Sequence, residues 1–181
     1  MALRKILTYP AEELKHFSEP VKNIDGGIDQ LVTDLVDTMY HAPGVGLAAP
    51  QVGITERIIV VDVDAAEDPG KKLVKLINPV IVEAEGSVIW EEGCLSVVDY
   101  TAEVKRANRI LVRAWTTEEK EIEIEAEEFF AVALQHEIDH LDGKLFIDRI
   151  SRLKRDLYRR KVKKWIRDGV PMEPKKSATG M

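Results

Sequence analysis

The chain has 181 residues, of which 45% are hydrophobic and 32% charged, a composition typical of a globular protein with one substantial hydrophobic core. No apolar run approaches the roughly 20 residues that span a bilayer, and residues 1–6 lack the apolar region of a secretory signal. We therefore expect a cytoplasmic protein with no membrane segment, and the single cysteine, Cys94, excludes an internal disulfide.

Charge is distributed unevenly along the chain. The net charge is −6, but residues 149–167 hold ten Lys and Arg and a single acid, Asp156. This stretch therefore carries +9, which leaves −15 for the rest of the chain. A basic segment attached to an acidic body is consistent either with a solvated helix face or with a surface that meets an anionic partner.

The first 24 residues contain two prolines, and we expect irregular structure there apart from a helical turn at 11–17. A helix is predicted from about 28 to 41, because apolar residues recur at helical spacing and a Pro-Gly pair follows them. The next segment, 44–51, is small, apolar and glycine-spaced, which suits a backbone that closely approaches another group.

Five strands are predicted next, with short turns and no helix between them. They cover residues 57–63, 73–83 with an interruption at Asn78-Pro79, 87–91, 104–114 and 120–126. Two helices follow, at about 127–140 and 151–167, and residues 169–181 are predicted to form a disordered tail. This order indicates a single domain over residues 1–168 with an α+β fold, in which mostly antiparallel sheets surround a central helix.

The chemistry is concentrated in the predicted central helix, at Gln135-His136-Glu137-Ile138-Asp139-His140. His136 and His140 are four residues apart, so both imidazoles leave the same face of a helix. With Glu137 between them they form the His-Glu-x-x-His arrangement, which supplies two metal ligands and a carboxylate that can handle the proton of a water. This spacing favours metal binding over histidines that merely pack or face solvent.

A catalytic metal site of this kind usually has three protein ligands and one open position. The candidates for the third ligand are Cys94, an acid, or His41. Cys94 is the best placed, because it follows a predicted strand beside Gly93, where the backbone can turn and expose a side chain. A lone cysteine is otherwise most often a small buried hydrophobe. A thiolate ligand would favour iron or zinc over magnesium or calcium.

Three stretches together resemble the signature motifs of the peptide deformylase family. They are Gly44-Val45-Gly46-Leu47-Ala48-Ala49-Pro50-Gln51, Glu92-Gly93-Cys94-Leu95-Ser96 and the histidine motif above. They occur in the order found in that family and at similar spacing, and the resemblance to its bacterial-type members extends over about residues 3–165.

The resemblance implies a site with one divalent metal, natively Fe(II), with zinc or nickel able to take its place. The implied metal ligands are Cys94, His136 and His140. Glu137 is implied as the general base and later the proton donor, and the amide of Gln51 and the backbone N–H of Leu95 as the oxyanion hole. Substrates of the family are nascent peptides that begin with N-formylmethionine, and the products are formate and a free N-terminal methionine.

The expected substrate contacts are of two kinds. The resemblance implies that the backbone around Val45, Gly46 and Gly93 pairs with an extended peptide. An apolar pocket for methionine is expected beside the metal, with candidate lining residues Leu47, Trp90, Phe129, Val132 and Ala133. Ordinary core packing is the alternative for these side chains, and for Phe129 the two alternatives are evenly balanced.

Below the cysteine loop, the resemblance suggests an ion pair between Glu92 and Arg106. The sequence departs from the family pattern after Cys94. Val98 stands where many relatives carry proline, and Thr101 where many bacterial members carry an arginine near the substrate entrance. These differences bear on peptide preference and leave the metal ligands unchanged.

Two rival functions remain at this point: a peptidase of the zincin type, and a catalytically inactive relative that only binds metal. A zincin would use a third ligand further along the helix in place of Cys94. A structural site would usually be closed by four protein ligands. The basic segment at 149–167 adds a hypothesis about partners, because it could guide the protein to ribosomal RNA.

Overall fold

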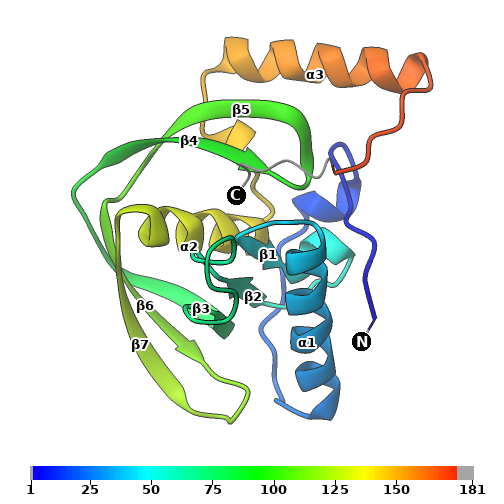
Figure 1. Ribbon diagram of the computed structural model, residues 1–181. Helices are drawn as coiled ribbons and strands as arrows, with labels where there is room; N and C mark the ends of the chain where they lie inside the picture. The colour runs from blue at the N-terminus through cyan, green and yellow to red at the C-terminus, as the bar shows by residue number, and fades with distance from the viewer. Residues whose placement is uncertain (1, 175–181) are drawn as a thin grey trace.

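The structure is a computed structural model, and it describes residues 2–174. A five-stranded sheet and a two-stranded hairpin lie on either side of one helix, α2, and two further helices, α1 and α3, lie on the outside (Figure 1). The predicted α+β class with a central helix is confirmed. No helix in the described part of the chain is long and apolar enough to cross a membrane.

All neighbouring strands are antiparallel. The large sheet has the order β1 (Gly46–Ala48), β2 (Ile58–Val61), β3 (Val74–Glu85), β6 (Arg109–Trp115) and β7 (Glu121–Glu127). The hairpin consists of β4 (Val88–Cys94) and β5 (Val97–Arg106). Strand β4 ends at Cys94, so the hairpin places the thiol beside the histidines of α2.

Three α-helices and three short 3-10 helices complete the fold. The α-helices are α1 (Gly26–His41), α2 (Glu128–Leu141) and α3 (Arg152–Arg167), and the 3-10 helices are η1 (Glu12–Lys15), η2 (Ala49–Val52) and η3 (Phe146–Asp148). The side chain of Asp25 caps α1 by accepting the N–H of Gly27 at 2.9 Å, and Ser151 caps α3 by accepting the N–H of Lys154 at 3.3 Å.

The hydrophobic core is divided between the two faces of the large sheet. On one face, Ala131, Leu134 and Ile138 of α2 pack against the sheet, whose side chains there include Ile59 and Val112. On the other face, α1 packs against the alternate residues of the same strands. A third cluster joins α3 to β5 and η3. Because apolar residues cover α2 along the sheet side, its histidines are directed toward the hairpin.

The strand predicted at 104–114 is wrong in its boundaries. The structure has two strands there, β5 and β6, which belong to different sheets and are separated at Ala107-Asn108. The amide of Gln135 binds this turn, accepting the N–H of Ala107 at 3.0 Å and donating to its carbonyl at 2.9 Å. The turn contains no glycine or proline that would mark it, so the sequence alone did not reveal the break.

The interruption predicted at Asn78-Pro79 is a register shift within one continuous strand. Asn78 adopts a positive φ of 52°, and its side-chain amide pairs with the backbone of Val21 at 2.8 and 2.9 Å. This pairing ties the N-terminal segment to the sheet and bends β3 without ending it.

At the other end of the chain, the structure describes part of the predicted tail. Residues 169–174 return toward the N-terminal segment, where the hydroxyl of Thr8 donates to the carbonyl of Met172 at 2.9 Å. The remainder of the predicted tail, 175–181, lies outside the described residues.

Candidate metal centre

Helix α2 and the end of β4 bring three potential metal ligands together. Sγ of Cys94 and one ring nitrogen each of His136 and His140 all lie within 4.8 Å of one another. Both histidines are buried, and Nε2 of His140 lies 3.4 Å from Sγ of Cys94. The structure therefore unites the ligands that the sequence placed 42 and 46 positions apart.

The turn after β4 orients the thiol. Cys94 and Val97 face each other across the hairpin, and the N–H of Ser96 donates to Sγ of Cys94 at 3.4 Å. This contact helps to fix the sulfur, which also lies 3.4 Å from Nε2 of His140. The turn thus prepares the sulfur as a ligand.

The two histidines differ in what holds them. Nδ1 of His136 lies 2.9 Å from the carboxylate of Glu92, which leaves Nε2 directed toward the other ligands. Burial by itself lowers the pKa of His136, but hydrogen bonds to Cys94 and Glu92 outweigh it and raise the pKa to about 10. Burial, and then the neighbouring His136, hold the pKa of His140 well below its usual value.

These properties fit a soft divalent cation. The raised pKa of His136 shows that positive charge is favoured beside Cys94 and Glu92. His140 is kept neutral, as a metal ligand must be. Nδ1 of His140 and Oε2 of Glu137 are buried and have no hydrogen-bond partner among residues 2–174. One thiolate and two imidazoles suit iron or zinc.

Glu137 lies beside this group and is buried. Burial, partly opposed by His136 and Arg106, raises the pKa of Glu137 to about 7. Its Oε1 approaches the backbone of Gly46 so closely that a Cβ at that position would clash with the carboxylate. Gly46 therefore leaves the space that Glu137 occupies, which explains a glycine in β1.

Gln51 is held at the edge of the same group. Its Oε1 accepts the N–H of Ala48 at 2.8 Å, and its Nε2 donates to the hydroxyl of Ser96 at 3.1 Å and lies 3.6 Å from Sγ of Cys94. The amide is thus fixed with its donor side toward the thiol. Leu95, the second predicted oxyanion donor, directly follows Cys94 in the same turn.

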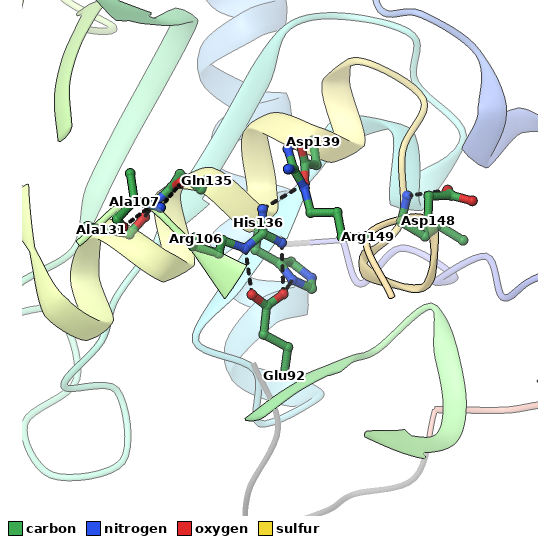
Figure 2. Close-up of polar contacts among 10 residues, drawn as sticks. Glu92, Arg106, Ala107, Ala131, Gln135, His136, Asp139, Asp148 and Arg149 are labelled. Carbon is green, nitrogen blue, oxygen red and sulfur yellow. Dashed lines mark hydrogen bonds and ion pairs between the residues drawn. The ribbon is translucent and has the colours of Figure 1, made fainter. Parts of the chain in front are cut away.

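A network of charged side chains supports the ligands, and sequence reasoning found only half of it (Figure 2). The suggested Glu92–Arg106 pair is present, and both side chains are fully buried, with Nη2 of the arginine 2.8 Å from Oε2. Arg106 also donates to the carboxylate of Asp139 at 2.7 Å, and Arg149 donates to the same carboxylate at 2.6 Å. Spacing gives no signal for Asp139 and Arg149, because their partners come from distant segments.

The predicted substrate residues lie around the group but differ in exposure. Trp90 of β4 and Phe129 of α2 are stacked with ring centroids 5.3 Å apart, and both are partly exposed. Val45 is also partly exposed, whereas Gly46 and Gly93 are buried in the backbone around the site. The remaining pocket candidates are fully buried in the hydrophobic core: Leu47, Val132 and Ala133.

Comparison with known proteins gives a consistent result. The family model described as polypeptide deformylase matches residues 3–156. A peptide deformylase of Thermodesulfovibrio yellowstonii is 50% identical over 163 residues, covering 90% of this chain and 98% of that protein. A crystal structure of a peptide deformylase from Legionella pneumophila superposes with a TM-score of 0.86 at 43% identity, over 94% of this chain and 99% of that one.

A second solved structure shows a relative with a bound molecule. The peptide deformylase from Ehrlichia chaffeensis in complex with actinonin has a TM-score of 0.83 at 40% identity, covering 91% of this chain and 98% of that one. The similarity therefore includes nearly the whole of each relative, and with it the elements that carry Cys94, His136 and His140.

Proposed function

The chain belongs to the peptide deformylase family, and from that premise we propose that it hydrolyses the formyl group from the N-terminal formylmethionine of nascent polypeptides and releases formate. The observation that carries this proposal is the convergence of one thiol and two imidazoles beside a buried carboxylate, one oxygen of which has no hydrogen-bond partner among the described residues. Family membership gives the rival zincin peptidase no support.

We propose Cys94, His136 and His140 as the ligands of one divalent metal, Fe(II) in the native protein, with zinc or nickel able to replace it. The donor set supports this choice, because a thiolate with two imidazoles selects a soft or borderline cation. When bound, the metal polarises a carbonyl oxygen and lowers the pKa of a bound water toward about 7.

Glu137 is the proposed acid and base. Its pKa of about 7 lets it exist in both protonation states near neutral pH, so it can take a proton from water and later give it to the leaving amine. Oε2, which has no partner among the described residues, is the oxygen available for that transfer. The absence of a Cβ at Gly46 leaves room for the carboxylate at this position.

Gln51 and Leu95 are the proposed donors to the oxyanion that forms on the former formyl oxygen. Nε2 of Gln51 already points toward the thiol, with a long contact of 3.6 Å that an oxyanion could replace. The backbone N–H of Leu95 belongs to the rigid turn after β4. Two neutral donors fixed before the substrate arrives stabilise charge without a reorganisation cost.

For the substrate we propose that the backbone of Val45, Gly46 and Gly93 pairs with the peptide. The methionine side chain would lie against the apolar group formed by Leu47, Trp90, Phe129, Val132 and Ala133. Trp90 and Phe129 offer the accessible surface of this group, and the three buried residues support it from behind.

We further propose that the protein is cytoplasmic and contacts ribosomal RNA through α3. Lys163 and Lys164 are exposed on this helix, whereas Tyr158 and Val162 anchor its opposite side in the third core cluster. Charge reversal at both lysines should weaken binding to ribosomes and reduce its salt dependence. Unchanged binding, or binding insensitive to salt, would contradict the contact.

The decisive experiment for the reaction is a comparison of two activities on the same peptides. The proposal predicts formate release from formyl-Met peptides by the Fe(II)-loaded protein and no cleavage of internal peptide bonds. Internal cleavage would support the peptidase alternative. Metal binding with neither activity would support an inactive relative.

A further inference from the structure

The carboxylate of Asp139 is held by two arginines that come from different parts of the chain. Arg106, at the end of β5, donates from Nη1 to Oδ2 at 2.7 Å. Arg149, in the segment between η3 and α3, donates from Nη2 to Oδ1 at 2.6 Å and from Nε to Oδ2. This two-point contact matches the planar guanidinium to both carboxylate oxygens.

A continuous line of hydrogen bonds leads from this contact to His136, one of the proposed metal ligands (Figure 2). Arg106 donates from its other two nitrogens, Nε and Nη2, to Glu92, and Oε2 of Glu92 lies 2.9 Å from Nδ1 of His136. We propose that Arg149 is a positioning residue for the ligand His136, and that it acts through Asp139, Arg106 and Glu92. The inference rests on the proposed metal site and is independent of the substrate.

The charges in this line show why the second arginine matters. Glu92 and Asp139 are two carboxylates with almost no exposed surface, and the fully buried Arg106 lies between them. Arg149 supplies the second positive charge, so Arg106 need not move toward Asp139 to neutralise it. Without Arg149, the guanidinium of Arg106 would be the one cation for both buried carboxylates, and its hydrogen bonds to Glu92 would weaken. Glu92 would then orient His136 less well.

The surroundings of Arg149 distinguish it from the other basic residues near α3. Its backbone N–H donates to the carbonyl of Phe146 at 3.0 Å, and the ring of Phe146 is buried and stacks on His136 with a centroid distance of 6.2 Å. The segment that bears Arg149 is therefore anchored beside the metal site. Its side chain reaches inward and remains 40% exposed, whereas Lys163 and Lys164 face solvent.

Positioning and simple electrostatics make opposite predictions for this residue. Loss of a positive charge near a bound cation should by itself strengthen metal binding. Loss of a positioning contact should weaken it, because the ligand is less well oriented. The direction of the change in metal affinity therefore separates the two effects.

The test is Co(II) binding to the full-length protein, measured by competition with a chelator and by the absorption spectrum of the bound ion. We expect R149M and R149K each to bind Co(II) about tenfold more weakly than wild type, with a changed spectrum. Lysine at position 149 should not restore Co(II) affinity, since it keeps the positive charge but cannot donate to both carboxylate oxygens of Asp139 as the planar guanidinium does. The matched control is R155M, because the one ion pair of the Arg155 side chain within residues 2–174 is with Asp148, at 3.8 Å.

A double variant tests whether the effect of Arg149 on Co(II) affinity depends on Glu92. Because E92Q already weakens the contact that orients His136, adding R149M to it should reduce the Co(II) affinity by less than a further factor of two. Wild-type affinity and spectrum in R149K would overturn the proposal, as would a full tenfold further loss in the double variant. R149K decides the matter even if R149M fails to fold. Failure of the proposed reaction would instead appear as absent formate release with normal Co(II) binding.

Discussion

Two groups of polar side chains meet at α2, and they differ in how completely they are satisfied. On the ligand side, Oε2 of Glu137 and Nδ1 of His140 are buried without a hydrogen-bond partner in the described part of the chain. On the supporting side, Glu92, Arg106 and Asp139 each contact two charged or polar partners. Unpaired buried groups cost stability and can react, whereas fully paired groups rigidify their surroundings. The two groups meet at α2, where Asp139 of the paired network lies between Glu137 and His140 in the sequence.

The largest effect on activity is expected on the ligand side. Replacement of Glu137 by Gln removes the proposed proton carrier and keeps the shape, so formate release should fall about 100- to 10,000-fold with the metal retained. Activity on formyl-Met peptides and metal content, measured on the same sample, check this. Glu128→Gln, at an exposed position of the same helix, should be neutral. Full activity in E137Q would remove Glu137 from the mechanism.

The largest effect on stability is expected on the supporting side. Arg106→Met leaves the buried carboxylates of Glu92 and Asp139 without their shared cation, and should lower the free energy of unfolding by about 3–5 kcal/mol. Urea denaturation of the metal-free protein measures this loss. Arg113→Met breaks an exposed pair with Glu123 and should cost at most about 1 kcal/mol. Equal losses in both variants would show that burial of the network adds nothing.

A smaller effect is expected where the backbone of Gly46 meets the carboxylate of Glu137. Gly46→Ala places a methyl group against Oε1 of Glu137 and should displace it, lowering kcat about 100-fold. Gly26→Ala is the control, because a Cβ there meets nothing within 4 Å. Steady-state kinetics should show the loss in kcat with metal affinity maintained. An unchanged kcat would mean that the carboxylate can act from more than one position.

The smallest effect is expected at a paired carboxylate far from the metal. A hydrogen bond from Gln30, followed by contacts with Arg4, keeps the pKa of Asp34 below its ordinary value of 3.8 although burial opposes this. Because the folded pKa is depressed, the stabilisation is complete well above 3.8 and is lost as the pH falls through the folded value. Asp34→Asn should cost about 1–2 kcal/mol at pH 7 and less in acid, by urea denaturation.

Metal affinity should be unchanged in this variant, which makes Asp34 the remote counterpart of Asp139. A stability difference between wild type and D34N that grows as the pH falls would contradict the assigned sign.

The sequence by itself determined what depends on local spacing. The helical period placed His136 and His140 on one face, and the apolar pattern predicted all three α-helices to within about two residues at each end. The motif around Cys94 indicated a candidate third ligand, and the structure places its sulfur beside both histidines. These features can be predicted from the sequence because backbone geometry alone fixes the relative positions of side chains on one helix or within one turn.

Only the tertiary structure decided the rest. The break between β5 and β6 depends on Gln135, which is 28 residues from the turn that it binds. The contact between Arg149 and Asp139 forms because the segment between η3 and α3 lies against α2. The contact between Glu92 and His136 joins residues that are 44 positions apart. Periodicity encodes which side chains share a face, but packing of distant segments decides which partners those side chains meet.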